Sequence, residues 1–149
     1  MDAMNEEMRS YYIRDLNRLI ENIKEIPEGR LWETPQGVEN SCGVLVQHLV
    51  GNLNHFIGEG LGKTGYVRAR DNEFSRTESS KKELIKNVEA LKLTLDSIFD
   101  ALENDTLDEE YPMELPFDAT TGGFLLHLYG HLNYHLGQIN YLRRLQSSA

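Results

Sequence analysis

Apolar residues recur every three or four positions in four long segments of this chain, and this spacing constrains the fold more than any other feature. The segments span about residues 4–26, 41–58, 79–102 and 121–146. Side chains at that spacing share one face of an α-helix. No run alternates polar and apolar residues for long enough to predict a strand. Because each helix must bury its apolar stripe against another helix, the sequence predicts an all-α fold, a four-helix bundle.

Caps and helix breakers set the expected boundaries. Pro27 and Gly29 should end the first helix, and Gly58, with further glycines after it, should end the second. Residues with side-chain oxygens precede the other three helices as candidate N-caps: Ser41, Ser80 (with Glu83 three residues later, as in a capping box), and Thr120 or Thr121. Two connections, 61–76 and 103–119, then exceed the usual helix–helix loop, and connections of that length are usually functional or crossovers.

Length and composition indicate a globular protein. The 149 residues suit a single helical domain, 1–149. The chain has one cysteine, so no intrachain disulfide can form, and a reducing compartment fits best. The first ten residues are polar and acidic, unlike a signal peptide, and no stretch approaches the ~20 apolar residues of a membrane span. We therefore expect a cytoplasmic protein.

The charge of the chain excludes some classes of partner. The formal net charge is -9, and lysines and arginines form no basic stripe. Phosphate binding normally depends on clustered basic side chains. We therefore expect neither nucleic acid nor an anionic membrane surface as a partner.

All five histidines lie in the second and fourth segments. They are His48 and His55 in the second segment, and His127, His131 and His135 in the fourth. Residues four apart on a helix lie about 6 Å apart on one face, so two such imidazoles can bind one ion. A third ligand must then come from a facing helix. A helical wheel favours His48, His131 and His135 as the inward set, although His55 or His127 could substitute, and a hydrogen-bonded boundary histidine is the commoner reason for this placement.

Two stretches of sequence resemble the DinB-like superfamily of four-helix bundles. The fourth segment, HLYGHLNYHLGQINYLRR, is similar to the last helix of that superfamily, and LVQHLVGNLNHF is similar to the helix that supplies its first histidine. The following GLGKTGYVRARDNEFS resembles the signature of an uncharacterised subgroup. The resemblance covers nearly the whole chain and implies metal binding by His48, His131 and His135.

The resemblance also implies a divalent ion, zinc or nickel, and frequent homodimers. Characterised relatives include thiol S-transferases and isomerases that use low-molecular-weight thiols such as bacillithiol, mycothiol or glutathione. Three protein ligands would leave a tetrahedral ion with an open position, as in catalytic zinc sites. Such an ion acidifies a bound thiol or water, so transfer of a thiol to a small electrophile and hydrolysis would both use the same three ligands.

Five further residues have two interpretations each. Arg68 and Arg70 could bind the carboxylates of a thiol substrate, but pairing with Asp71, Glu73 or another surface acid is the favoured interpretation. Asn52 could bind a metal-bound water or make a boundary hydrogen bond. Gln138 could orient His135, but we favour a structural role. Cys42 could be a redox thiol, because a helix N-terminus lowers thiol pKa, but we expect an inert thiol.

Two functions are consistent with these patterns. The first is a metal-dependent enzyme, either a thiol transferase or a hydrolase. The second is a noncatalytic stress-response or ligand-binding bundle in which any metal is structural, because no general acid or base is recognisable beside the histidines. We favour the enzyme. Fold and family resemblance do not fix the chemistry, which depends on the geometry of the site.

Overall fold

The computed structural model describes residues 3–147, and within that range it contains helices and connections but no strand beyond one isolated bridge between Glu110 and Thr120. The α-helices are α1 (Ala3–Glu25), α2 (Cys42–Leu53), α3 (Gly60–Gly62), α4 (Arg70–Glu73), α5 (Lys81–Ala101) and α6 (Thr121–Ser147). A π-helical turn, η1 (Asn54–Glu59), joins α2 to α3, and a 3-10 turn, η2 (Asn104–Asp108), follows α5. The domain predicted for residues 1–149 extends at both ends beyond the described residues.

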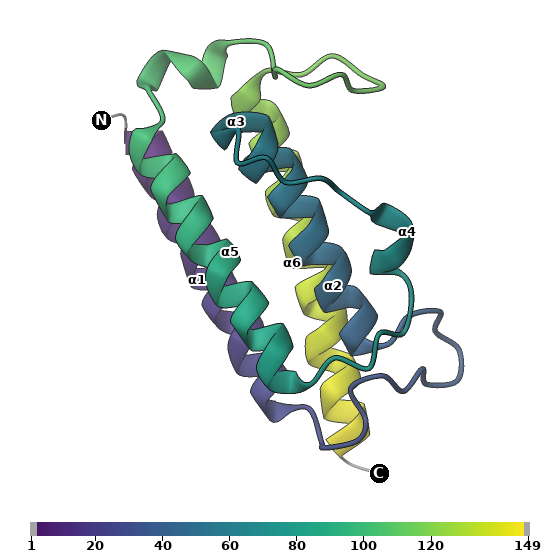
Figure 1. Ribbon diagram of the computed structural model, residues 1–149. Coiled ribbons are helices and arrows are strands. Elements are labelled where there is room, and N and C mark those ends of the chain that lie inside the picture. The colour runs from purple at the N-terminus through teal and green to yellow at the C-terminus, as the bar shows by residue number, and fades with distance from the viewer. Residues whose placement is uncertain (1–2, 148–149) are drawn as a thin grey trace.

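The predicted all-α four-helix bundle is confirmed, and its long helices are α1, α2 with its extension, α5 and α6 (Figure 1). The helices α1 and α5 lie side by side and antiparallel, since the Asn5 side chain bonds to the carbonyl oxygen of Leu102 at 3.1 Å. The helices α2 and α6 form the other antiparallel pair. Leucine and isoleucine side chains from all four helices fill the core, and the buried Tyr12 hydroxyl donates to the carbonyl oxygen of Leu125 at 2.6 Å.

The predicted N-caps are present on three helices. Ser41 Oγ accepts a hydrogen bond from the backbone N–H of Val44, and Ser80 Oγ accepts one from that of Glu83, both at 3.1 Å. Of the two threonines expected at the last helix, Thr120 is the cap, because its Oγ1 accepts from the N–H of Gly123 at 3.0 Å. Each cap satisfies one backbone donor that a helix start leaves without an intrahelical partner.

The end predicted for the second helix, at Gly58, is wrong. The helical path continues through η1 and α3 and ends at Lys63, whose φ of 48° is left-handed. A Cβ atom at Gly60 would overlap the Tyr111 hydroxyl, and one at Gly62 would overlap Ile98. These two glycines therefore allow close packing inside a helix rather than ending it.

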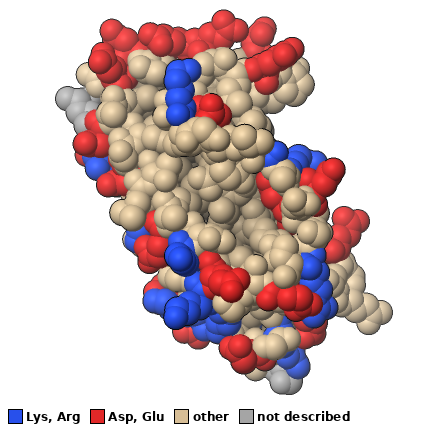
Figure 2. Space-filling view, in the orientation of Figure 1, with Lys and Arg blue, Asp and Glu red and all other residues tan. Residues whose placement is uncertain are grey.

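The connections place segments of the chain over the bundle. Residues 63–80 cross from the end of α3 to the start of α5 and carry α4. Residues 102–120 cover the end of the molecule where α3 and the start of α6 lie (Figure 1). Both were predicted to be long, but a third long connection, 26–41, was not. Acidic side chains crowd the end of the molecule where 102–120 lies (Figure 2). No helix in residues 3–147 is long and apolar enough to cross a membrane.

Candidate metal centre

Three imidazoles from two antiparallel helices converge on one point. His48 comes from α2, and His131 and His135 lie one helical turn apart on α6. His131 Nε2 lies 3.1 Å from His48 Nε2 and also 3.1 Å from His135 Nε2. The three residues offer ligand atoms that all lie within 4.8 Å of one another, and no fourth histidine, cysteine or acid among residues 3–147 joins them.

These separations fit a divalent ion. Zinc–nitrogen distances of about 2.0–2.1 Å place the nitrogens of a tetrahedral site about 3.3 Å apart. The two measured Nε2–Nε2 separations, 3.1 Å each, are close to that edge length. Neutral imidazole is a good ligand for zinc and nickel. The structure is therefore compatible with a metal site formed by His48, His131 and His135.

Hydrogen bonds on the far side of two rings turn their Nε2 atoms toward the common point. His48 Nδ1 lies 3.0 Å from Glu73 Oε1, and His135 Nδ1 lies 2.8 Å from Gln138 Oε1. A carboxylate and an amide oxygen can only accept, so both Nδ1 atoms donate and both Nε2 atoms keep a lone pair for an ion. Bonds of this kind orient metal-binding histidines and fix their tautomers.

The surroundings also keep two of the three histidines, His48 and His131, in the neutral form that binds metal. Burial, together with the neighbouring imidazoles, lowers the pKa of His131 to about 4. Burial also lowers the pKa of His48, although its hydrogen bond to Glu73 opposes that effect. Both rings are therefore uncharged near pH 7, and no proton competes with an ion for their lone pairs.

Glu73 is a site residue that sequence analysis named only as a surface partner for the two arginines. Its carboxylate is buried and binds His48. It also accepts hydrogen bonds from Nε and Nη2 of Arg68, at 2.8 and 2.9 Å. The Gln47 side chain donates to the backbone oxygens of Glu73 and Ser75, which fastens α4 to α2. Gly51 leaves the space for this carboxylate, since a Cβ there would overlap it. No sequence signal marked Glu73, because acids in exposed connections are common.

A cavity of about 310 Å³ adjoins the three-histidine cluster. It lies between α2 with η1, the start of α6, and the connections 63–80 and 102–120, and its lining includes His48 and His131. The other lining residues are Asn52, Phe56, Arg68, Arg70, Leu115, Pro116, Phe117, Phe124, His127 and Leu128. The cluster is thus accessible to a small molecule from this side, as a catalytic site requires.

The structure separates residues that the sequence could not rank. Arg68 is held by Glu73, whereas Arg70 has no ion pair among residues 3–147 and its guanidinium lies 5.2 Å from the centre of the Phe74 ring. The other histidines lie outside the cluster: His127 lines the cavity, and His55 Nδ1 is buried without a partner among the described residues. Asn52 lines the cavity, and Gln138 contacts His135.

Cys42 lies at the start of α2, away from the cluster. It is fully buried, and burial raises the pKa of its thiol to about 12. The thiolate is the reactive form of cysteine, so burial and the raised pKa both agree with the inert thiol predicted from the sequence.

Comparison with known proteins agrees with this architecture. Residues 2–149 match the model of a family described as "Protein of unknown function (DUF1572)". A search of curated proteins finds no match to the chain. Among solved structures, the chain is similar to a DinB-like protein, YjoA, from Bacillus subtilis, with a TM-score of 0.71 and 18% identity over 95% of this chain and 92% of that one. The chain therefore belongs to the DUF1572 family, and its bundle has the DinB-like fold.

Proposed function

We propose that this protein is a divalent-metal-dependent enzyme that transfers a low-molecular-weight thiol to a small electrophile, with zinc or nickel held by His48, His131 and His135. The observation that carries the proposal is the convergence of three imidazoles beside a cavity, with no fourth protein ligand among residues 3–147. Structural zinc sites close the fourth position with a protein ligand, whereas catalytic sites leave it open.

A bound ion would lower the pKa of a thiol in the cavity, so that the sulfur is deprotonated near pH 7. The residues of the chain prepare the site for this chemistry. Glu73 and Gln138 hold the His48 and His135 rings in position, and Arg68 balances the buried charge of Glu73. The site is therefore organised before a substrate enters, which reduces the cost of reaching the transition state.

The cavity lining favours thiol transfer over hydrolysis. Hydrolysis at such a site commonly uses a carboxylate as general base, but no acidic residue lines this cavity, and Glu73 is already bound by His48 and Arg68. A thiol needs less help, because its ordinary pKa is far closer to 7 than that of water. In the transfer, the thiol gives its proton to solvent, its sulfur forms a C–S bond, and a leaving group such as chloride departs with the electron pair of the broken bond.

Metal content tests whether the three histidines bind a divalent ion. We expect untagged protein from zinc- or nickel-supplemented medium to contain one equivalent of metal, measured by elemental analysis. The variants His48→Ala and His135→Ala should lose it while circular dichroism shows an unchanged helical content. His55→Ala is the matched control, because His55 lies on the same helical stretch as His48 but outside the cluster. Protein without stoichiometric metal after supplementation would refute the proposal.

Measurement of turnover tests the proposed thiol transfer and separates it from a noncatalytic role. We expect the loaded protein to consume a chlorinated arene or an epoxide only when a small thiol is present, and His131→Ala to abolish this. If metal binds in one equivalent but neither thiol transfer nor ester hydrolysis is detected, the alternative of a stress-response or ligand-binding bundle with a structural metal is correct. Hydrolysis without thiol dependence would instead support a hydrolase.

A further inference from the structure

We propose that the cavity beside the three-histidine cluster takes a small aromatic molecule that carries one negative charge. This inference rests on the proposed function only in making that molecule a substrate of the enzyme. The binding itself follows from residues that are not metal ligands. Three features of the cavity support it: its size and aromatic walls, one arginine without an ion pair, and one buried amide oxygen without a hydrogen-bond partner.

The size and walls of the cavity select a planar, largely apolar ligand. Its volume of about 310 Å³ is at the small end of ligand pockets, which usually measure ~300–1,000 Å³, and suits a single ring with short substituents. Phe124 packs edge-on to Phe56 at 5.2 Å and nearly parallel to His127 at 5.7 Å. Phe117, which is 47% exposed, lies beside both Phe124 and His127. Four aromatic rings thus meet at this cavity, and aromatic ligands pack well against such walls.

Arg70 gives the cavity its positive charge. No aspartate or glutamate lines the cavity, and the charge of Arg68 is already balanced by Glu73. Arg70 lies over the ring of Phe74, which in turn lies 4.7 Å from the ring of His48. This stack holds the guanidinium near the cluster and leaves its N–H groups available to a carboxylate, which arginine binds well.

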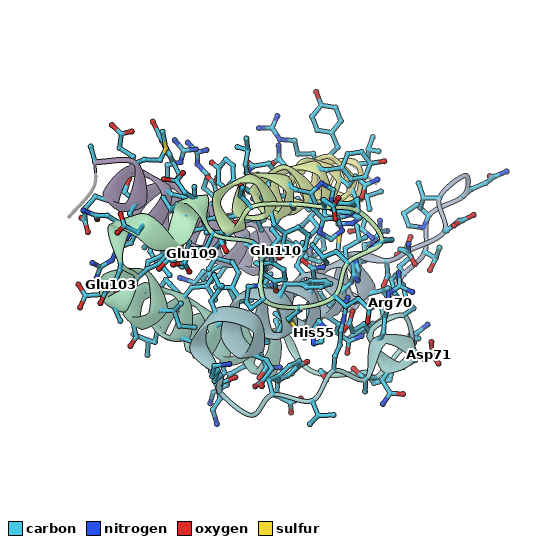
Figure 3. The ribbon with its side chains drawn as sticks, turned by 90° about the horizontal axis from the view of Figure 1, so that it is seen from above. His55, Arg70, Asp71, Glu103, Glu109 and Glu110 are labelled. Carbon is cyan, nitrogen blue, oxygen red and sulfur yellow. The ribbon has the colours of Figure 1, made fainter. Side chains whose placement is uncertain are left out.

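No acidic side chain among residues 3–147 forms an ion pair with Arg70. In Figure 3 Arg70 lies on the opposite side of the view from Glu103, and Glu109 and Glu110 also lie away from it. Asp71 is next to Arg70 in sequence, but no ion pair joins them. A chain with a net charge of -9 thus keeps one arginine without an ion pair among residues 3–147 at this cavity.

Asn52 supplies a further polar contact for the ligand. The residue is 7% exposed, it lines the cavity, and its Oδ1 atom has no hydrogen-bond partner among residues 3–147. Buried polar atoms in native proteins nearly always have partners, so one without a partner at a cavity wall indicates a ligand contact. The ligand therefore carries a hydrogen-bond donor or, with the Asn52 amide rotated, a further acceptor.

Titration with 4-fluorobenzoate, followed by 19F NMR on metal-free and zinc-loaded protein, tests the inference. We expect saturable binding in both forms, about 10-fold weaker binding in Arg70→Gln, and weaker binding in Phe117→Ala by roughly 2–10-fold. Arg76→Gln is the matched control, because Arg76 lies on the same connection but pairs with Glu78 outside the cavity, and it should bind as the wild type does.

Neutral 4-fluorobenzamide separates charge from shape. We expect it to bind at least 10-fold more weakly than 4-fluorobenzoate. Equal affinity for the two probes, or unchanged affinity in Arg70→Gln, overturns the inference. Binding of 4-fluorobenzoate that depends on Arg70 in a protein that takes up no metal would support the inference and refute the proposed function. Stoichiometric metal with no preference for the anionic probe would support a metal site, as the proposed function requires, and would refute the inference.

Discussion

Glu73 accepts a hydrogen bond from His48 Nδ1 at 3.0 Å, although 25 residues separate the two in sequence. Through this contact the connection 63–80 is fastened to the three-histidine cluster. The same carboxylate binds Arg68 through two hydrogen bonds, so its charge is balanced without solvent. A buried carboxylate in this position raises the basicity of the imidazole that would bind the ion.

Removal of the Glu73 charge should weaken metal binding. In Glu73→Gln, the amide no longer favours the His48 tautomer as strongly, and Arg68 loses its ion pair. We expect zinc affinity to fall about 10–100-fold, measured by competition with a chromogenic chelator. Asp71→Asn is the control, because Asp71 lies on α4 but is exposed and outside the cluster. Equal affinities in both variants would show that the Glu73–His48 contact does not support the site.

A single methyl group at Gly51 should have a similar effect. A Cβ at this position would overlap the Glu73 carboxylate and push it away from His48. We expect Gly51→Ala to lower zinc affinity, by competition assay, and to increase proteolysis within residues 63–80. Gly58→Ala is the matched control, since its nearest neighbour would be Thr64 Oγ1 at 3.5 Å, an ordinary contact. That variant should keep the affinity and gain up to about 1 kcal/mol of stability, because alanine favours helix more than glycine does.

Asp15 links α1 to α6 and should make stability depend on acid pH. Its fully buried carboxylate accepts hydrogen bonds from Arg14, Tyr129 and Asn133. Burial alone raises the pKa of Asp15, but these hydrogen bonds outweigh it, and the pKa lies below its usual value. The stabilisation is therefore complete above the unfolded pKa of about 3.9 and is lost as the pH falls through the lower folded pKa.

Urea denaturation of Asp15→Asn at several pH values checks this contribution of Asp15 to stability. At pH 7 we expect a loss of about 1–3 kcal/mol in the free energy of unfolding, because the buried partners of the carboxylate lose their acceptor. The difference from the wild type should shrink as the pH falls below 3. Asp100→Asn is the control, since the Asp100 side chain is 67% exposed and its one ion pair among residues 3–147 is with Arg9. A difference that stays constant between pH 7 and pH 2.5 would contradict the assignment.

Cys42 should react with thiol reagents only after unfolding. Burial raises the pKa of its thiol to about 12, so almost no thiolate exists at pH 8, and the side chain is fully buried. We expect labelling by Ellman's reagent to be undetectable in buffer and rapid in 8 M urea. Rapid labelling of the native protein would show that the start of α2 opens readily.

The outer face of α6 should pack against a second copy of the chain. Leu126, Tyr134, Tyr141 and Leu145 are 65–71% exposed there, and Gly130 and Gly137 leave open space around the backbone. In a chain with a net charge of -9, an apolar face is where two copies meet with least repulsion. We expect light scattering to give twice 17.1 kDa, and Tyr141→Glu to give the monomer. Leu93→Glu, at an exposed leucine of α5, should leave the mass unchanged.

Local sequence signals determined the helices, their caps and the shared face of two of the three site histidines, His131 and His135. His131 and His135 face the same way because any α-helix places residues four apart on one face. The caps Ser41 and Ser80 were predictable because a capping hydrogen bond spans only three residues. The glycines at 58, 60 and 62 misled the same approach, because Gly60 and Gly62 pack closely against Tyr111 and Ile98, distant residues that local rules do not include.

Tertiary structure decided the rest. Whether His48 meets His131 depends on the register of α2 against α6, which the packing of two whole helix faces sets. Arg68 and Arg70 are two residues apart and alike in chemistry, but the path of the connection 63–80 gives one of them to Glu73 and leaves the other at the cavity. A helix has a fixed period that can be read from sequence, whereas a connection has none. The side chains of a connection acquire their partners only when the bundle that the connection crosses has formed.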